Sequence, residues 1–389
     1  MSLKASEIKY VLHHIIKNNR YLEERGKKKN SILIESEAGI GKTSIVQQVA
    51  EESGLGFVKI NLSNIEQAGD LTGFPYIELE YSKDDGSKGW ISTKQLEHSG
   101  EKFNLSGYSR TSYSPPAWVP KDGSGIILLL DDFTRAPTHI MQAVMEIVDK
   151  GEYVSWALPQ DCHVMLTSNP SNGDYIVTEL DGAQKTRFIR LEMKFNVDEW
   201  ASWAEKVGVD SRCINFLMLN PEMIKGNTNA RLATDYFNSI SSLNEFGSAE
   251  ALQLINLLGE GSVGAEFSAC FALFVNNKLD KVPSPKDLFE AKDDETAVAK
   301  IKAVVGKVDT QEYKQNIASV LSTRIINYCD KIIEDKTFDK KKIVPRVSEI
   351  IKSGTFSGDI NFNLVKNLNT RKQFASLVEQ KEIVKIITR

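Results

Sequence analysis

Cysteine is scarce in this sequence of 389 residues, and its four copies are far apart. They are Cys162, Cys213, Cys270 and Cys329, and no two of them have CxxC spacing. Zinc sites and redox pairs both need closely spaced cysteines, so this pattern argues against either. We therefore expect reduced thiols that are mostly buried.

Long apolar runs and an excess of basic residues are also missing. No stretch approaches the roughly 20 apolar residues of a membrane helix, and charged residues interrupt positions 1–20, where a signal peptide would need an apolar core. We expect a cytoplasmic protein without membrane insertion. Lys and Arg number 48 against 52 Asp and Glu, for a net charge of −4. This balance does not favour nucleic acid as the main partner.

The composition is that of an ordinary globular protein, with 41% hydrophobic and 26% charged residues. Short apolar, often β-branched runs in the first half predict strands. These runs are 31–35, 57–61, 126–130, 163–167 and 187–193. Helix-like stretches at 43–53 and 138–149 lie between them, and this alternation predicts an α/β fold with a parallel sheet flanked by helices.

The strand signals stop after residue 198, and helical patterns follow at 200–216, 230–243 and 251–258. The segment 81–116 is rich in Gly, Ser, Lys, Asp and Tyr with weak periodicity, and long loops of this kind are usually functional or mobile. We expect three parts: an α/β core at 1–197 with an insertion at about 74–118, a helical domain at 198–290, and a helical C-terminal region at 291–389.

The strongest chemical motif runs from Ser36 to Thr43 as Ser-Glu-Ala-Gly-Ile-Gly-Lys-Thr, between a predicted strand and a predicted helix. This is the context of a P-loop, in which backbone N–H groups and the helix N-terminus bind phosphates. We expect Lys42 to neutralise the β- and γ-phosphates of ATP and Thr43 to bind Mg²⁺. The expected nucleotide contacts are Glu37, Ala38, Gly39, Ile40, Gly41, Lys42, Thr43 and Ser44.

The motif departs from the usual P-loop at one position, and it has one alternative interpretation. Ser36 stands where Gly is usual, which is acceptable only if the turn needs no positive φ at that position. A Gly-rich surface turn is the alternative, and the motif arises by chance in a chain of this length on the order of one time in a hundred.

A second motif is the apolar strand 126–130 followed by Asp131 and Asp132. Carboxylates at the C-terminal end of a parallel strand lie where α/β sheets bind their ligands. We expect Asp131 to hold Mg²⁺, directly or through water, and Asp132 to act as general base on the attacking water. Glu is usual at the second position, and the shorter Asp predicts slow hydrolysis. Alternatively, Asp132 caps a helix that opens at Thr134.

The acidic pair with the following Phe-Thr-Arg-Ala-Pro, 133–137, resembles the second ATPase motif of the MoxR and dynein-related branch of AAA+ proteins. The Asp-Leu-Thr-Gly at 70–73 and the Pro-Pro-Ala-Trp at 115–118 are similar to segments that flank an insertion in that family. The resemblance covers roughly 10–290. It implies a ring-forming ATPase, a hexamer in the usual case, with an α/β core and a helical lid.

The resemblance gives roles to three further residues. Asn169, after the strand 163–167, is similar to the sensor-1 residue that contacts the γ-phosphate and the attacking water; as an alternative, Asn-Pro is a common turn. Arg187 is similar to the arginine finger donated to a neighbouring subunit, with Arg190 and Arg135 as rivals. Arg231, in a helix start that Thr228 or Asn229 can cap, resembles sensor 2. A solvated surface charge is the alternative for each arginine.

The family also implies chaperone-like remodelling of a protein client, often with a partner that carries a von Willebrand A-type domain. Two other function classes compete with this expectation. The first is a nucleotide-gated assembly scaffold in which Asp132 hydrolyses ATP too slowly to do work. The second is a DNA-directed motor, which the acidic net charge disfavours. A P-loop metabolic kinase is the weakest candidate, because the sequence has no separate acceptor-binding signature.

Overall fold

The computed structural model describes residues 2–170, 177–226, 228–305 and 311–387. The chain forms two compact units, Met1–Lys194 and Phe195–Arg389. The first unit contains all the described strands, and the described part of the second is helical.

A six-stranded sheet forms the centre of the first unit, and every neighbouring pair in it is parallel. Its spatial order is β1 (Ser2–Leu3), β11 (Phe188–Met193), β2 (Ser31–Glu35), β10 (Cys162–Ser168), β7 (Ile126–Asp131) and β3 (Gly56–Asn61). The inner strands β7 and β10 are buried along their whole length, which explains their continuous apolar runs. The predicted α/β class is confirmed.

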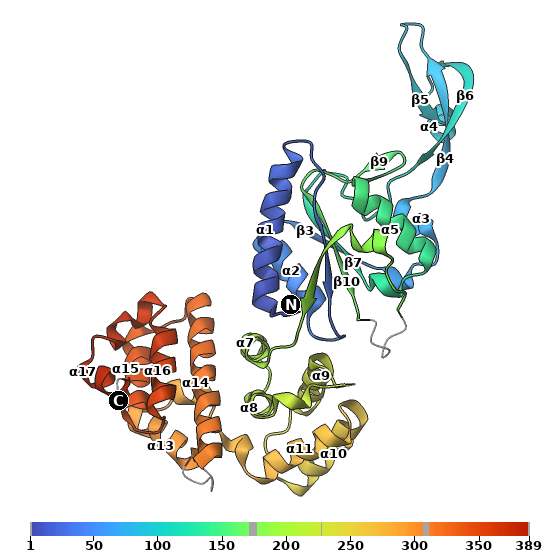
Figure 1. The fold of residues 1–389 in the computed structure, drawn as a ribbon. Coiled ribbons are helices and arrows are strands. Elements are labelled where there is room, and N and C mark those ends of the chain that lie inside the picture. Colours follow the sequence, from blue (N-terminus) through green and yellow to red (C-terminus); the bar gives the residue numbers. More distant parts are fainter. Residues whose placement is uncertain (1, 171–176, 227, 306–310, 388–389) are drawn as a thin grey trace. The chain divides into compact units, whose positions relative to one another are not determined.

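Helices cover the sheet on both faces (Figure 1). Because side chains alternate along a strand, Ile32 and Ile34 of β2 pack in the core with α1 (Ala5–Glu23) and α2 (Lys42–Glu52). Leu33 faces the opposite side, where α5 (Thr138–Lys150) buries its apolar stripe. The two cores hold the sheet rigidly between them, so that its strand ends can position functional groups.

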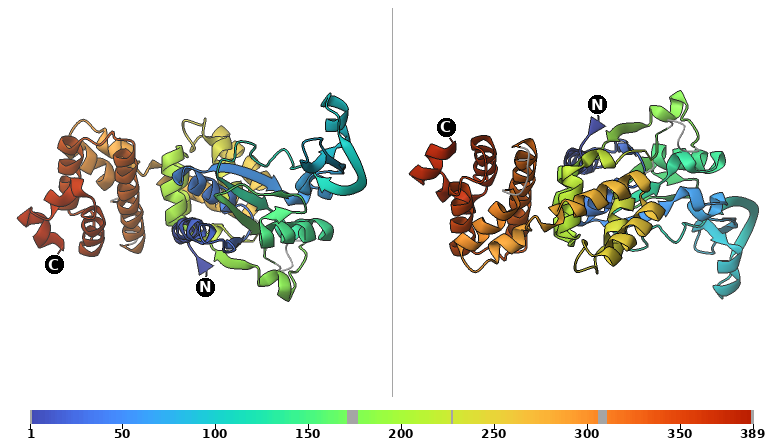
Figure 2. Two further views of the ribbon diagram at one scale, coloured as in Figure 1. Left: turned by 90° about the horizontal axis from the view of Figure 1, so that it is seen from above. Right: turned by 90° about the horizontal axis from the view of Figure 1, so that it is seen from below.

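An arm interrupts the first unit between α3 (Ala68–Thr72) and β7, and it extends away from the sheet in every view (Figures 1 and 2). It is an antiparallel sheet of order β5-β4-β6, and its elements are β4 (Pro75–Ser82), β5 (Lys88–Ser92), α4 (Thr93–His98) and β6 (Asn104–Tyr113). The reading of 81–116 as an irregular loop was wrong. Most of β6 is exposed, so it carries no apolar alternation for a sequence to reveal.

The root of the arm is fixed to the core. Gly73 has φ +82°, and a Cβ there would lie 1.7 Å from the Ser114 carbonyl oxygen, so only Gly fits. The short hairpin of β8 (Glu152–Tyr153) and β9 (Trp156–Ala157) holds the same region: Ser155 Oγ donates to the Tyr113 carbonyl at 3.0 Å. The indole of Trp156 also donates to the Thr72 carbonyl at 2.8 Å.

The second unit is built from helices around one apolar core. These are α7 (Val197–Val207), α8 (Ser211–Leu219), α9 (Ala230–Ile240), α10 (Ala249–Ser262), α11 (Ala265–Asn276), α12 (Pro285–Phe289), α13 (Asp294–Val305), α14 (Gln311–Glu334), α15 (Lys340–Lys352), α16 (Gly358–Leu368) and α17 (Lys381–Ile387). The pattern read over 200–216 is two helices, because Gly208 ends α7 in a left-handed conformation with φ +82°.

A buried arginine ties the parts of this unit together. Arg324 of α14 is fully buried and pairs with Glu205 of α7. It also donates to the Asn215 side chain of α8 at 2.7 Å and to Ser211 Oγ at 2.8 Å. A buried guanidinium with all these partners fixes α14 on α7 and α8.

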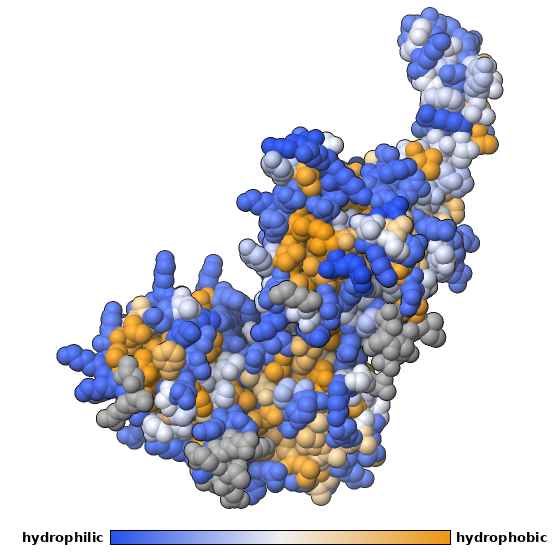
Figure 3. All heavy atoms as spheres, viewed as in Figure 1, coloured by the Kyte–Doolittle hydropathy of each residue, from blue (hydrophilic) through white to orange (hydrophobic). Residues whose placement is uncertain are grey.

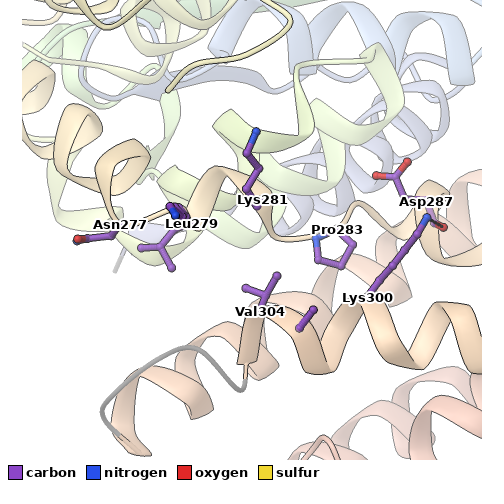
Figure 4. Close-up of a pocket in the computed structure, with 9 residues that line it drawn as sticks. Asn277, Leu279, Lys281, Pro283, Asp287, Lys300 and Val304 are labelled. Carbon is purple, nitrogen blue, oxygen red and sulfur yellow. Dashed lines mark hydrogen bonds between the residues drawn. The ribbon is translucent and has the colours of Figure 1, made fainter. Parts of the chain in front are cut away.

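The surface of the second unit has an exposed apolar patch and a cavity. Apolar side chains gather over α10 and α11 (Figure 3), where Leu254, Leu257, Leu258 and Leu273 are exposed. A cavity of about 530 Å³ is lined by η4 (Leu279–Lys281) and parts of α12 and α13 (Figure 4). Its Lys300 donates to the Asp287 carbonyl at 3.1 Å.

No helix among the described residues is long and apolar enough to cross a membrane.

Candidate functional site

The loop between β2 and α2 has the backbone of a phosphate cradle. Gly39 and Gly41 have φ of +74° and +98°, values that glycine adopts without strain. Ser36 is not among the residues with positive φ, so the serine is accepted at that position, as the sequence required. Helix α2 begins at Lys42 directly after this turn and directs its N-terminal N–H groups and dipole toward the loop.

Lys42 is buried, with 8% of its surface exposed, and its ammonium group donates to three neutral oxygen atoms. The Nζ atom donates to the Ser36 carbonyl at 2.8 Å, to the Glu37 carbonyl at 3.1 Å and to Asn169 Oδ1 at 3.0 Å. The positive charge is therefore held inside the loop, where a phosphate oxygen can replace a neutral acceptor.

Asp131 is the last residue of β7 and lies beside Thr43. The Thr43 hydroxyl is 3.4 Å from each carboxylate oxygen, Thr167 Oγ1 donates a short hydrogen bond to Oδ1, and Lys59 Nζ is 2.7 Å from Oδ2. Burial works against the charged form of Asp131. Its pKa is nevertheless below the usual value, because the Lys59 ammonium and the Thr167 hydroxyl stabilise the carboxylate.

Asp132 has a left-handed backbone with φ +57°, uncommon for a residue other than glycine. Its N–H donates to Thr167 Oγ1 at 3.1 Å, and its Oδ2 is 4.0 Å from the Arg135 guanidinium. It precedes η2 (Phe133–Arg135), but its side chain makes no capping hydrogen bond. Asp132 therefore occupies the N-cap position of η2, as the alternative placed it before a helix, but it does not cap that helix by a side-chain hydrogen bond.

Three of the expected residues meet at one edge of the sheet. Lys42 follows β2, Asp131 ends β7, and Asn169 follows β10, which lies between those two strands. Since all three strands are parallel, their C-terminal ends share this edge, where α/β folds bind ligands. The contact between Lys42 and Asn169 is the direct sign of this convergence.

The candidate finger arginines have partners within the first unit. Arg187 pairs with Asp149 and donates to the Ala183 carbonyl at 3.0 Å, although a third of its side chain stays exposed. Arg190 makes a two-pronged ion pair with Glu35 at 2.9 and 3.0 Å. Each guanidinium donates through two nitrogen atoms; Arg190 directs both to one carboxylate, whereas Arg187 divides them between a carboxylate and a carbonyl.

Arg231 lies in the second unit, in the first turn of α9, with an exposed side chain. The Asn229 side chain caps this helix by accepting from the Leu232 N–H at 3.0 Å, as expected of a residue at this position. Thr228 instead donates to the Val263 carbonyl at 2.8 Å.

Sequence reasoning missed two residues that contact the expected metal ligand. Thr167 bonds both Asp131 and the Asp132 N–H, and Lys59 forms an ion pair with Asp131. A signal for Thr167 exists in retrospect, since it is a polar residue near the C-terminal end of a fully buried strand. Lys59 gave none, because a lysine in a partly exposed strand is ordinary.

The side chains at this edge fit a nucleotide with Mg²⁺. A threonine hydroxyl and a carboxylate are the hard oxygen ligands that Mg²⁺ prefers, and it normally takes few protein ligands together with phosphate oxygens and water. The described residues contain no group of three or more His, Cys, Asp or Glu side chains that could hold a metal ion. Thr43 and Asp131 would hold the ion.

Comparisons with known proteins add little to this geometry. No family model matches the chain, and no curated protein matches it. Among solved structures, the RuvB Holliday junction branch migration motor of Thermotoga maritima matches 76% of this chain and 80% of its own, at 12% identity and a TM-score of 0.36. A DNA polymerase III gamma subunit-related protein of Thermotoga maritima matches 98% and 99%, at 12% identity and a TM-score of 0.31. Likenesses this distant carry no argument about function.

Proposed function

We propose that the protein binds ATP with Mg²⁺ at the C-terminal edge of its parallel sheet and hydrolyses it. The observation that carries this proposal is the convergence of the buried Lys42 ammonium, the Thr43–Asp131 pair and Asn169 behind a loop with two left-handed glycines. A Gly-rich surface turn would not bury a lysine or place it against a polar residue from a distant strand.

In this proposal each side chain has one task. Lys42 neutralises the β- and γ-phosphates, and Mg²⁺ held by Thr43 and Asp131 adds the remaining positive charge. Asn169 orients the attacking water and contacts the γ-phosphate, and Asp132 takes the proton of that water. The left-handed backbone of Asp132 supports a functional role, since strained residues of this kind concentrate at active sites.

We further propose that the chain is a ring-forming AAA+ protein of the MoxR kind, with a hexamer as the usual form. Arg187 then acts on the neighbouring site and Arg231 acts from a lid at 198–290, followed by the region 291–389. The exposed leucines of α10 and α11 support assembly, because soluble proteins rarely leave such a cluster uncovered. Hydrolysis would serve the remodelling or activation of a protein partner, with a von Willebrand A-type domain protein as the candidate.

A nucleotide-gated scaffold is the second candidate, and the identity of Asp132 favours it. Asp is one methylene shorter than the usual Glu, so it must act through a longer path or an additional water. In that case ATP assembles the ring and is hydrolysed too slowly to drive work.

Steady-state phosphate release tests the activity. The wild type should turn over ATP only with Mg²⁺, and Lys42→Ala should be inactive. A turnover that Lys42→Ala leaves unchanged would sink the proposed site. ATP binding with Mg²⁺ but turnover below about one per hour would select the scaffold, because typical enzymes turn over on the order of one or more times per second.

Mixing two inactive variants tests the ring and the trans role of Arg187. Lys42→Ala has an empty site but an intact arginine, whereas Arg187→Ala keeps its own ATP but lacks the finger. Mixed rings should regain activity in a concentration-dependent way, since closed rings assemble by mass action. If native mass measurement shows mixed rings without activity, Arg187 is not the finger, and Arg190 and Arg135 are tested in the same way.

A further inference from the structure

Lys59 is a charged residue of the candidate site to which the proposed chemistry gives no task. It lies on β3, and its Nζ is 2.7 Å from Asp131 Oδ2. The lysine side chain is 40% exposed, whereas that of Asp131 is 11% exposed. A partly hydrated cation therefore sits directly on the carboxylate that is expected to hold Mg²⁺.

The register of the sheet fixes this contact. β3 and β7 pair in parallel, with Asn61 opposite Asp131 and Lys59 opposite Leu129. Residues two apart on a strand share a face, so Lys59, Asn61 and Asp131 all lie on one side of the sheet. The lysine reaches Asp131 diagonally from a strand that the sheet holds in place.

The Asp131 carboxylate has few acceptor positions left. A carboxylate offers about four lone-pair positions on its two oxygens. Thr167 donates to Oδ1, the Thr43 hydroxyl is near both oxygens, and Lys59 occupies Oδ2. Mg²⁺, or a water molecule that it polarises, needs a position on the same oxygens. Two cations close to one carboxylate also repel each other, so each lowers the occupancy of the other.

We propose that Lys59 is a tethered competitor of Mg²⁺ for Asp131, and that it sets how much Mg²⁺ the nucleotide site requires. In the nucleotide-free protein the ammonium compensates the buried carboxylate. When Mg²⁺ binds with a nucleotide, Lys59 leaves Oδ2 and its flexible stem returns the charge to solvent. This inference rests on the proposed function, because it concerns the metal site of the same nucleotide.

The size of the effect follows from the exposure of the pair. Ion pairs with an exposed lysine contribute little, because water screens the charge and ordering of the side chain costs entropy. The low exposure of Asp131 and the short contact place this pair at the upper end of that range. Removal of the ammonium should therefore strengthen the effect of Mg²⁺ on nucleotide affinity by about fivefold.

Calorimetric titration with ADP measures this effect directly. Each protein is titrated with saturating Mg²⁺ and again with EDTA, and the ratio of the two dissociation constants gives the metal coupling. Lys59→Met removes the charge and keeps the length of the stem, and Lys59→Gln repeats the change with a polar replacement. Lys59→Arg keeps a cation.

Lys9→Met is the matched control. Lys9 makes an ion pair of similar length, 2.6 Å, with Glu52. Glu52 ends the 11-residue helix α2, about 15 Å along the axis from Lys42 at its start. The control therefore removes a lysine charge and a salt bridge without touching Asp131.

The expected result is a metal coupling about fivefold larger in Lys59→Met and Lys59→Gln, and unchanged in Lys59→Arg and Lys9→Met. ADP binding with the same coupling in all five proteins overturns this inference and leaves the proposed function intact. Failure of the wild type to bind ADP under either condition overturns the proposed function, and the role of Lys59 with it.

Discussion

The buried Lys42 of the first unit and the buried Arg324 of the second are held by different kinds of partner. Lys42 in the first unit donates to two backbone carbonyls and one side-chain amide, all of them neutral. Arg324 in the second unit pairs with the Glu205 carboxylate and also bonds Asn215 and both the hydroxyl and the carbonyl of Ser211. Both side chains are covered; packed helices hold a carboxylate against the Arg324 guanidinium, whereas the three hydrogen bonds of Lys42 given above go to neutral oxygen atoms.

The difference separates a structural charge from a functional one. A guanidinium bound to a carboxylate and three further acceptors has no reason to exchange partners, so it fixes helices. An ammonium bound to neutral oxygens gains energy when a phosphate replaces one of them. We therefore expect loss of Arg324 to act on stability and loss of Lys42 to act on nucleotide binding.

The largest effect is expected for Arg324→Met. The substitution leaves Glu205 with 12% side-chain exposure and without its cation, and breaking a buried pair from one side costs about 3–5 kcal/mol. Urea unfolding should show this loss of stability. Lys206 lies on α7 beside Glu205 and makes an exposed ion pair with Glu334 of α14, so Lys206→Ala should cost less than about 1 kcal/mol. Equal losses in the two variants would contradict the structural role of Arg324.

Lys42→Ala should come next, with a loss in ADP affinity of about a hundredfold or more, because the phosphates lose a charge-assisted partner. Its effect on unfolding should be small by comparison. Calorimetric titration and urea unfolding on the same preparation measure both quantities. If Lys42→Ala lost as much stability as Arg324→Met and still bound ADP like the wild type, Lys42 would be a structural residue and not a nucleotide-binding one.

Asp132→Asn should keep Mg²⁺–ATP binding and lose turnover by about a hundredfold, the usual contribution of a general base. The amide keeps the size of the side chain and removes the proton acceptor. Phosphate release and ATP titration together separate the two effects. Wild-type turnover in this variant would show that the base lies elsewhere.

The smallest effect concerns the thiols, which the sequence predicted to be reduced and mostly buried. All four are free; Cys162, Cys213 and Cys329 are buried, and Cys270 is half-buried. Burial raises the pKa of Cys162 to about 12 and also raises the pKa of the other three. Cys270 should be alkylated first in the folded protein, and Cys270→Ser should remove that reaction. Early labelling of Cys213 would contradict the packing of α8.

The P-loop, the acidic strand end and the α/β class were predicted from the sequence, because each depends on residues that are close together in the chain. Gly39, Gly41 and Lys42 need only a strand before them and a helix after them, and both are present. The partners of Asp131 could not be read in this way. Lys59 and Thr167 reach it across strand pairs, and register between distant strands leaves no local pattern.

The arm and the Arg324 network escaped prediction for related reasons. Most of β6 is exposed and lacks the period of two that reveals a strand, although β4 carries one, with Ile77, Leu79 and Tyr81 alternating with glutamates. Arg324 appears in the sequence as one more arginine in a helix. Its burial depends on the packing of α14 against α7 and α8, which no single segment encodes.

A crystal structure with ADP and Mn²⁺ tests the central claim most directly, since Mn²⁺ replaces Mg²⁺ and is located by its anomalous scattering. The account predicts phosphates in the loop from Ser36 to Lys42, an anomalous peak beside Thr43 and Asp131, and Lys59 moved away from Oδ2. A peak at any other place, or ADP bound without contact to Lys42, would contradict it.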